Sequence, residues 1–287
     1  MNSFLILVAT FFLSFQACAD LSKIHFSLST DPIDVVIPCA PKDRKTLSLC
    51  IEGIRKYGKN IRRVIVVSKE RLTDEAEWFS ENAYPFTKER IAAEIFYGKT
   101  RFAKKFLKSK KSRIGWIYQQ FLKLYAPFVI PGISSNVLVL DSDVIFLAPV
   151  EFMNGRGEPI FHPGSEYHPP YFQHMERLLP DLKRVDEQES GIAHHMLFQK
   201  PILEDLFGLI SKKHKKEAWK AICRSIDEKV VYHSSMSEYE IYFNFVQLRT
   251  DQFEKIALKY IDVNPLREIA KYQNQGFAFI TSHEYGK

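Results

Sequence analysis

Short apolar runs recur along the chain and alternate with stretches of helical spacing. Residues 33–37, 64–67 and 137–140 are dominated by β-branched residues and leucine, which is typical of strands buried on both faces of a parallel sheet. Residues 94–97 and 159–161 are shorter apolar runs. The pattern predicts a strand at each of these five places.

Helical stripes lie between these runs. Residues 46–57 carry apolar side chains at three- and four-residue spacing, and Gly58 marks the end of that stripe. Residues 73–80 and 114–125 show a similar pattern, and Pro127 is expected to stop the second. Strands and helices in this alternation predict an α/β sheet with right-handed crossovers.

The pattern changes after residue 160 to helices and irregular stretches, with helices expected at residues 200–225 and 237–246. No Ser/Gly-rich linker and no internal repeat separates the two halves. We therefore expect one domain over residues 20–287.

Composition narrows the class of protein. The chain has 287 residues, of which 46% are hydrophobic and 14% aromatic. It is long enough to bury a core without a metal or a disulfide framework, and the composition excludes a disordered or collagen-like chain. The net charge is +6. Because the chain carries no recognised nucleic-acid-binding motif, we expect no nucleic-acid partner.

Residues 1–19 contain no charged side chain. The apolar run from Phe4 to Phe15, followed by Ala17 and Ala19, is typical of a cleaved export signal and is short for a membrane span. A lipoprotein signal modified on Cys18, an uncleaved anchor and a misassigned start codon are the alternatives. We expect an exported or membrane-anchored protein, or a cytoplasmic one if the signal is misread.

The remaining cysteines are Cys39, Cys50 and Cys223, and none of them forms a C-x-x-C pair. This spacing fits neither a zinc site nor a disulfide framework. We expect buried free thiols, with one disulfide as the alternative in a non-reducing compartment.

Two carboxylates follow the strand at residues 137–140. Asp141 and Asp143 are separated by one residue, so in extended backbone both point to the same side. Open α/β sheets bind their ligands at the carboxyl ends of strands. Oxygen ligands without cysteine suit Mg²⁺ or Mn²⁺ shared with a diphosphate. The alternative is a polar turn after an edge strand, which the apolar run at Val144–Leu147 disfavours.

Two nucleotide chemistries use such a D-x-D pair. Haloacid-dehalogenase phosphatases need it near the chain start with a Gly and a Thr after it, whereas Val144 and Ile145 follow here. GT-A glycosyltransferases place it after a nucleoside-binding βαβ half, which is the position of Asp141. The GT-A pattern is therefore favoured.

Five segments carry a resemblance in their order and spacing: Ile33–Asp43, Gly115–Leu124, Val137–Asp143, Gly191–Phe198 and Ser237–Asn244. Over residues 32–285 the chain resembles a bacterial family of uncharacterised proteins that is grouped with the nucleotide-diphospho-sugar transferases. The resemblance implies a single α/β domain with a GT-A-like, Rossmann-type mixed sheet flanked by helices. It also implies glycosyltransferase activity.

The resemblance implies where the donor binds. In the GT-A pattern the loop after the first strand holds the nucleoside, which here corresponds to Pro38, Cys39, Ala40, Lys42 and Asp43. Asp43 would accept a hydrogen bond from a base or ribose. A plain strand-helix turn is the alternative interpretation of this loop.

Further donor-binding candidates lie later in the chain. Trp116, Gln120 and Lys123 share one side of a predicted helix, and Lys123 is expected either to neutralise a diphosphate or to be exposed. The resemblance adds Gly191 with His194 or His195, in a loop that contacts the donor sugar. Neighbouring residues of an extended segment point in opposite directions, so one of these two histidines is expected to face the site.

The catalytic candidate is Glu238. Ser237 and Glu240 form a capping-box pattern at the start of a helix, and Glu238 is not needed for it. In the GT-A pattern an acidic residue at this position faces the acceptor and serves as general base in inverting enzymes. A base must reach the acceptor hydroxyl to take its proton.

The expected metal ligands are Asp141, Asp143 and His283. An apolar strand is expected at residues 277–282, and GT-A enzymes often complete the metal shell with a histidine near the chain end. A neutral imidazole suits Mn²⁺ better than Mg²⁺. A frayed tail is the alternative. His162 and His168 are expected in a mobile acceptor loop.

The stretch from Arg101 to Arg113 holds seven basic residues in thirteen. A solvated helix face is one interpretation. Attraction of an anionic acceptor, of a membrane surface or of the donor diphosphate is the other.

Taken together, these features predict a glycosyltransferase that depends on Mn²⁺ or Mg²⁺. It would transfer a sugar from a nucleoside diphosphate, with a UDP-sugar favoured, to an unknown glycan, lipid or protein acceptor. The alternatives are a nucleotidyltransferase, a metal-dependent phosphatase, or a non-catalytic carbohydrate-binding protein.

Overall fold

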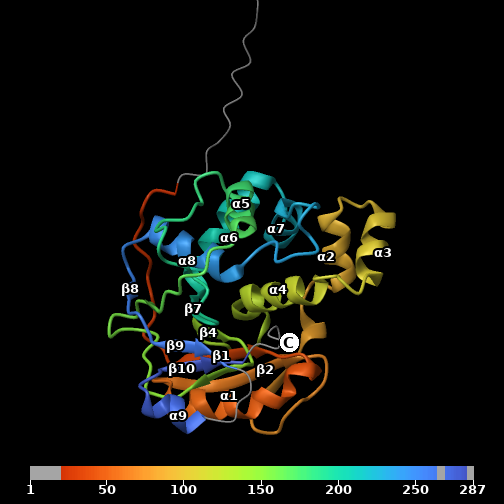
Figure 1. Cartoon of the computed structure of the whole chain (residues 1–287). Coiled ribbons are helices and arrows are strands. Elements are labelled where there is room, and N and C mark those ends of the chain that lie inside the picture. Colours follow the sequence, from red (N-terminus) through yellow and green to blue (C-terminus); the bar gives the residue numbers. More distant parts are fainter. Residues whose placement is uncertain (1–20, 264–268, 283–287) are drawn as a thin grey trace, which may run out of the picture.

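The computed structural model describes residues 21–263 and 269–282, so the predicted export signal lies outside the described residues. The central sheet has five strands in the order β3-β2-β1-β4-β7. These strands are β1 (Ile33–Pro38), β2 (Ile61–Ser68), β3 (Glu77–Ser80), β4 (Asn136–Leu140) and β7 (His195–Gln199). The first four run parallel, and β7 pairs with β4 in the antiparallel direction. The prediction of a mixed α/β sheet flanked by helices is confirmed (Figure 1).

The strands β1, β4 and β7 are buried along their whole length, and their side chains alternate between two halves of the core. In β1, Val35 and Ile37 pack with one half, whereas Val36 packs with the other. The helix α1 (Arg44–Tyr57) covers the first face. The opposite face is covered by α4 (Ile114–Val129), α6 (Lys200–His214) and α8 (Glu238–Arg249), as Figure 1 shows.

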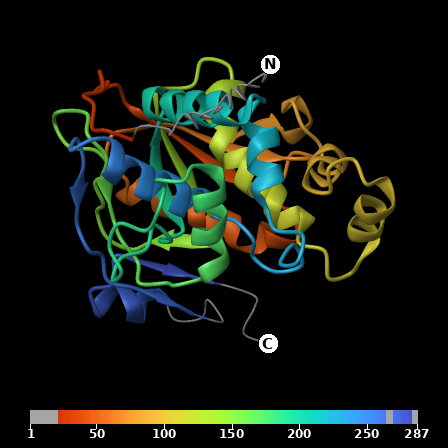
Figure 2. The ribbon, with the colours of Figure 1, turned by 90° about the horizontal axis from the view of Figure 1, so that it is seen from above.

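The remaining helices of the larger layer are α2 (Lys88–Ile95), α3 (Thr100–Lys108), α5 (Pro169–Leu178) and α7 (Ala218–Ser225). The helix α3 packs against α2. It lies at the outer edge of the molecule both in Figure 1 and, in yellow, in Figure 2.

The shorter strands form separate, smaller sheets. β5 (Val144–Phe146), β10 (Phe279–Thr281) and β9 (Tyr260–Asp262) form one sheet, and β6 (Ile160–Phe161) pairs with β8 (Glu254–Lys255). The short helix α9 (Ile269–Asn274) precedes β10. Because β10 is antiparallel to β5, it brings the end of the described chain beside the segment that follows Asp141.

Two predicted elements are wrong, and the predicted end of one confirmed helix is displaced. Residues 94–97 complete α2 and a turn, because the Thr87 side chain caps that helix and Tyr97 takes a left-handed conformation. Residues 73–80 do not form a helix: their last four residues are β3, which pairs along the edge of β2. The helix α4 continues past Pro127 to Val129. Pro127 lies in its last turn, where its ring removes the N–H that would bond the Lys123 carbonyl oxygen, and the helix ends two residues later.

The cysteine prediction is confirmed. Cys39, Cys50 and Cys223 are buried and free, and burial raises the pKa of the Cys39 thiol to about 11. Among the described residues, no helix combines the length and the apolar character needed to cross a bilayer.

Protonation of one core histidine is expected to weaken the fold in acid. His174 on α5 is fully buried, its Nε2 bonds the carbonyl oxygen of Ile222 on α7, and burial lowers its pKa to about 4. A histidine in an unfolded chain titrates near 6.5, so the unfolded state takes up a proton first as the pH falls from 6.5 towards 4. Between pH 7.5 and 5.0 this one group is expected to remove about 2 kcal/mol from the free energy of unfolding.

Urea unfolding of the wild type and of His174→Gln at both pH values measures this contribution. The variant keeps a donor for Ile222 and should lose about 2 kcal/mol less on acidification. An equal loss in both proteins contradicts the prediction.

Candidate functional site

The strand order of the central sheet reverses between β1 and β4. The chain proceeds outward from β1 to β2 and β3, and then returns to place β4 on the other side of β1. Open α/β sheets bind ligands at the carboxyl ends of strands at such a point. The loop Pro38–Asp43 follows β1 and Asp141 follows β4, so the structure brings these two predicted segments to one edge. Gln119 of α4 joins them by donating from Nε2 to the Pro38 carbonyl oxygen at 3.4 Å.

A buried ammonium group lies at the centre of this edge. The Lys123 side chain is 2% exposed, and its Nζ lies 2.5 Å from Asp141 Oδ1 and 2.6 Å from Glu238 Oε1. The same Nζ donates to the Tyr239 hydroxyl at 3.2 Å and lies 4.3 Å from the centre of that ring. Lys123 is therefore neither exposed nor directed at solvent, and it joins two of the carboxylates singled out in the sequence.

A helix face, a strand end and a helix start determine this meeting. The helix α4 packs across β1, β4 and α8, and it presents Lys123 on its inward face. The strand β4 ends at Leu140, which puts Asp141 at its carboxyl end. The Ser237 hydroxyl accepts from the Glu240 N–H at 3.2 Å, so the predicted N-cap is confirmed and α8 begins at Glu238.

Burial and charge act in opposite directions on the pKa values of this group. Burial favours a neutral Lys123, but Asp141 and Glu238 outweigh it and hold the lysine pKa well above its usual value. Burial also opposes ionisation of Asp141, yet Lys123 and then His194 lower its pKa far below normal. For Glu238 burial prevails over Lys123, and its pKa is raised. Lys123 and Asp141 are therefore a charged pair, and Glu238 is the more basic carboxylate.

His194 connects this buried group to a carboxylate at the surface. The antiparallel pairing of β7 with β4 lets the Asp141 N–H donate to the His194 carbonyl oxygen at 3.0 Å. The imidazole lies 3.6 Å from Asp141 Oδ2 through Nδ1 and 4.0 Å from Glu166 Oε1 through Nε2. Glu166 is 49% exposed. Sequence reasoning did not find Glu166, because a single glutamate in a loop carries no motif.

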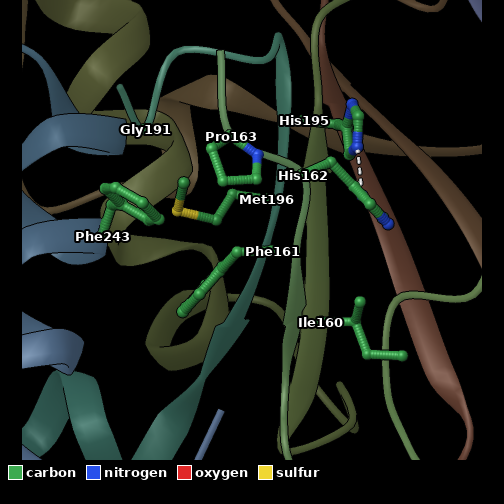
Figure 3. A pocket seen from close by; sticks show the side chains of 8 residues that line it. All are labelled: Ile160, Phe161, His162, Pro163, Gly191, His195, Met196 and Phe243. Carbon is green, nitrogen blue, oxygen red and sulfur yellow. Dashed lines mark hydrogen bonds between the residues drawn. The ribbon is translucent and has the colours of Figure 1, made fainter. Parts of the chain in front are cut away.

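His195 has different surroundings from its neighbour. Its Nε2 lies 2.9 Å from His162 Nδ1 (Figure 3). Its ring also packs edge-on against Phe146, Phe152 and Phe279. Burial lowers the pKa of His162 to about 4 and that of His195 well below its usual value. Of the two adjacent histidines, His194 contacts Asp141, whereas His195 forms a neutral core pair with His162. The prediction that His162 belongs to a mobile acceptor loop is therefore wrong.

Gly191 and Gln120 both make contacts inside the protein. A Cβ on Gly191 would lie 2.7 Å from the Tyr239 carbonyl oxygen and 2.7 Å from the Phe243 Cβ, so the absence of a side chain lets this segment pack on α8. Gln120 is buried and donates to the Trp116 carbonyl oxygen one turn earlier in α4. Donor binding by these two residues stays a prediction.

The loop after β1 approaches the D-x-D segment. Asp43 pairs with the neighbouring Lys42 at 2.8 Å. Cys39 is buried, and after burial itself the charges of Asp43 and Asp143 both raise its pKa. Ala40 is exposed beside Cys39. The Cys39 thiol, within the predicted nucleoside loop, is therefore near enough to the second aspartate to feel its charge.

The predicted metal ligands are partly described. The Ser282 N–H donates to the Asp143 carbonyl oxygen at 3.2 Å, so β10 delivers the chain end to the D-x-D turn. His283 itself lies outside the described residues. Within residues 21–263 and 269–282, no group of three or more His, Cys, Asp or Glu side chains has a geometry that would hold a metal.

Comparison with known proteins places the chain in a family. A family described as "Family of unknown function (DUF6492)" matches residues 30–276. The chain belongs to this family. No curated protein matches the chain.

Solved structures of low similarity include two glycosyltransferases. Mouse xyloside xylosyltransferase 1 in its apo form is 8% identical, with a TM-score of 0.39 over 90% of this chain and 99% of that chain. The apo WbbM bifunctional glycosyltransferase is 13% identical, with a TM-score of 0.45 over 92% of this chain and 47% of that chain. At these TM-scores neither likeness supports a functional argument.

Removal of the central ammonium is expected to destabilise the protein. Lys123→Met leaves Asp141 and Glu238 buried without their shared counter-charge, which typically costs about 3–5 kcal/mol. Adding Glu238→Gln to Lys123→Met removes one of the two carboxylate charges that this variant leaves buried. The double variant should therefore lose at least about 1 kcal/mol less than the sum of the single variants.

Urea unfolding measures all three variants. The matched control is Lys59→Met, which breaks an exposed ion pair with Glu151 and should cost about 1 kcal/mol or less. A loss for Lys123→Met as small as that of the control contradicts the prediction, as do strictly additive effects.

Proposed function

We propose that the protein is a metal-dependent glycosyltransferase that moves a sugar from a nucleoside diphosphate to an acceptor. The observation that carries the proposal is a carboxylate pair at the switch point of a Rossmann-ordered sheet, with its first member fixed by a buried lysine. Ligands of open α/β sheets bind at this place. The resemblance of the D-x-D segment to the GT-A pattern supports a sugar nucleotide, with a UDP-sugar favoured.

The charge balance of the site suits a divalent cation. Asp141, Asp143 and Glu238 are three carboxylates, and Lys123 is the cation that contacts two of them. Asp141, Asp143 and His283 would hold the metal, although Asp141 Oδ1 also faces Lys123. Carboxylate oxygens with one imidazole suit Mn²⁺ or Mg²⁺. The bound ion would neutralise the charge that develops on the leaving diphosphate.

The remaining residues have distinct proposed roles. Lys123 fixes Asp141 in its ionised form at the end of β4, and His194 supports the second oxygen of that carboxylate. The loop Pro38–Asp43 binds the nucleoside. An open hollow lies between the start of α1 and the segment after β2, and its charged lining residues are Arg44, Arg71, Asp74 and Glu75.

Glu238 is the proposed general base. Its raised pKa suits proton abstraction, and its Oε2 accepts no hydrogen bond from the described residues. Glu238 is 1% exposed, so the acceptor hydroxyl would have to reach a buried carboxylate. Glu166 is a second candidate, favoured by its exposure and by its position next to His194.

The compartment in which the protein acts determines which sugar nucleotides it can meet. We propose that residues 1–19 direct export or anchoring. Sugar nucleotides are made in the bacterial cytosol, so an exported enzyme would act where another compartment supplies the donor. Sequencing the mature N-terminus tests this proposal.

Loss of the second aspartate is expected to abolish turnover. Asp143→Asn removes a charged metal ligand and should lower the release of nucleoside diphosphate from the accepted UDP-sugar by about 100-fold or more in Mn²⁺. The matched control is Asp251→Asn, an exposed residue that pairs with Lys23. Its rate should equal that of the wild type.

The product separates the proposed activity from the alternatives. Release of pyrophosphate identifies a nucleotidyltransferase, and release of inorganic phosphate identifies a phosphatase. If no product forms and Asp143→Asn leaves metal-dependent nucleotide binding unchanged by calorimetry, the proposed function is wrong.

The two candidate bases are distinguished by isosteric variants. Glu238→Gln should lower kcat for sugar transfer by about 100-fold while donor binding is retained, because the amide cannot take a proton. Glu166→Gln should change kcat by no more than about threefold if Glu238 is the base. Steady-state kinetics with saturating donor measures both, and the opposite result assigns the base to Glu166.

A further inference from the structure

The positive charge of the chain is concentrated before the site. From Ile95 to Leu140 there are nine basic residues and no acidic one. The whole chain has 40 basic and 34 acidic residues, so the remainder has 31 and 34 and a net charge of −3. One segment therefore accounts for the basic character of the whole chain.

The structure gathers this charge on one stripe of α3. Arg101, Lys104, Lys105 and Lys108 follow the spacing i, i+3, i+4, i+7, and all four are exposed. Ala103 and Phe106 are buried on the opposite side. Among the described residues, none of the four basic side chains forms an ion pair with a carboxylate. These charges are available to an external partner.

Aromatic side chains border the basic stripe. Phe102 is 54% exposed and stacks on Phe96, with ring centres 6.4 Å apart and planes 21° apart. Tyr97 is also 54% exposed and donates its hydroxyl to the Arg224 carbonyl oxygen. Both are held in place by the protein although much of their surface faces outward. A purely electrostatic site for a soluble anion would not need exposed rings.

The shape of the molecule makes this surface accessible. The helix α3 packs against α2 and lies at the outer edge in both views (Figures 1 and 2). Lys110 and Lys111 are exposed in the loop that follows. A peripheral convex face suits a broad, flat partner better than a small ligand, which requires a concave pocket.

We propose that the basic and aromatic face of α3 docks the protein on an anionic lipid bilayer. Clustered lysines and arginines are attracted to anionic headgroups, and an aromatic ring at the edge of such a stripe enters the interface. This surface is separate from the proposed catalytic site and does not depend on the glycosyltransferase assignment.

Co-sedimentation with vesicles tests the proposal in the full chain. Wild-type protein should bind vesicles of phosphatidylcholine that contain about 30 mol% phosphatidylglycerol. High salt should weaken that binding because it screens the charges. Lys104→Glu/Lys105→Glu/Lys108→Glu should bind roughly 100-fold more weakly, and Phe102→Ser several-fold more weakly. Residues 1–19 are the same in all proteins, so these differences belong to α3.

The matched control is Lys69→Glu/Lys183→Glu/Lys212→Glu. These three lysines are exposed elsewhere, and the variant has the same net charge as the α3 variant. It should bind within about threefold of wild type, since its charges lie away from the surface. Equal loss in both triple variants overturns the proposal, as does unchanged binding by the α3 variant. If heparin displaces the wild type completely and Phe102→Ser binds like wild type, the face is a soluble-polyanion site and the proposal is wrong.

Discussion

The buried ammonium of Lys123 is the interaction on which the site depends. A lysine removed from water inside a protein is unfavourable unless carboxylates compensate it, and here Asp141 and Glu238 do so within 2.6 Å. Those two residues lie at the end of β4 and at the start of α8. The ion pairs therefore require a helix, a strand end and a helix start to meet at one point, and this meeting fixes the D-x-D segment against the larger helical layer.

The segment between α3 and α4 connects the helix that carries Lys123 with the surface helix α3. Arg113 lies between α3 and α4 and donates from Nη2 to the Ser234 hydroxyl oxygen at 3.0 Å. Ser234 precedes the N-cap of α8 by three residues, and Trp116 stacks on Tyr171 at a centroid distance of 6.1 Å. The basic face of α3 and Lys123 of α4 therefore lie on consecutive helices, and the segment between these helices is held against the residues that precede α8.

Much of the fold was predictable because the relevant signals are local. Runs of β-branched residues marked β1, β2 and β4, and helical stripes marked α1 and α4. The failures have tertiary causes. Residues 77–80 became a strand because the edge of β2 offered hydrogen-bond partners, and residues 94 and 95 stayed helical because the Thr87 cap started a helix that includes them. A short apolar run does not by itself distinguish these outcomes.

By itself, the sequence determined the D-x-D pair, its place after a buried strand, the helix start at Ser237 and the concentration of basic residues before α4, because residue order and periodicity suffice for these features. Only the tertiary structure decided what Lys123 contacts, which of His194 and His195 reaches Asp141, and that Glu166 joins them. Those facts rest on contacts between residues far apart in the chain, and on a left-handed His194 that breaks the alternation expected of a strand. The local sequence pattern does not specify such contacts, because they depend on how the elements pack against one another.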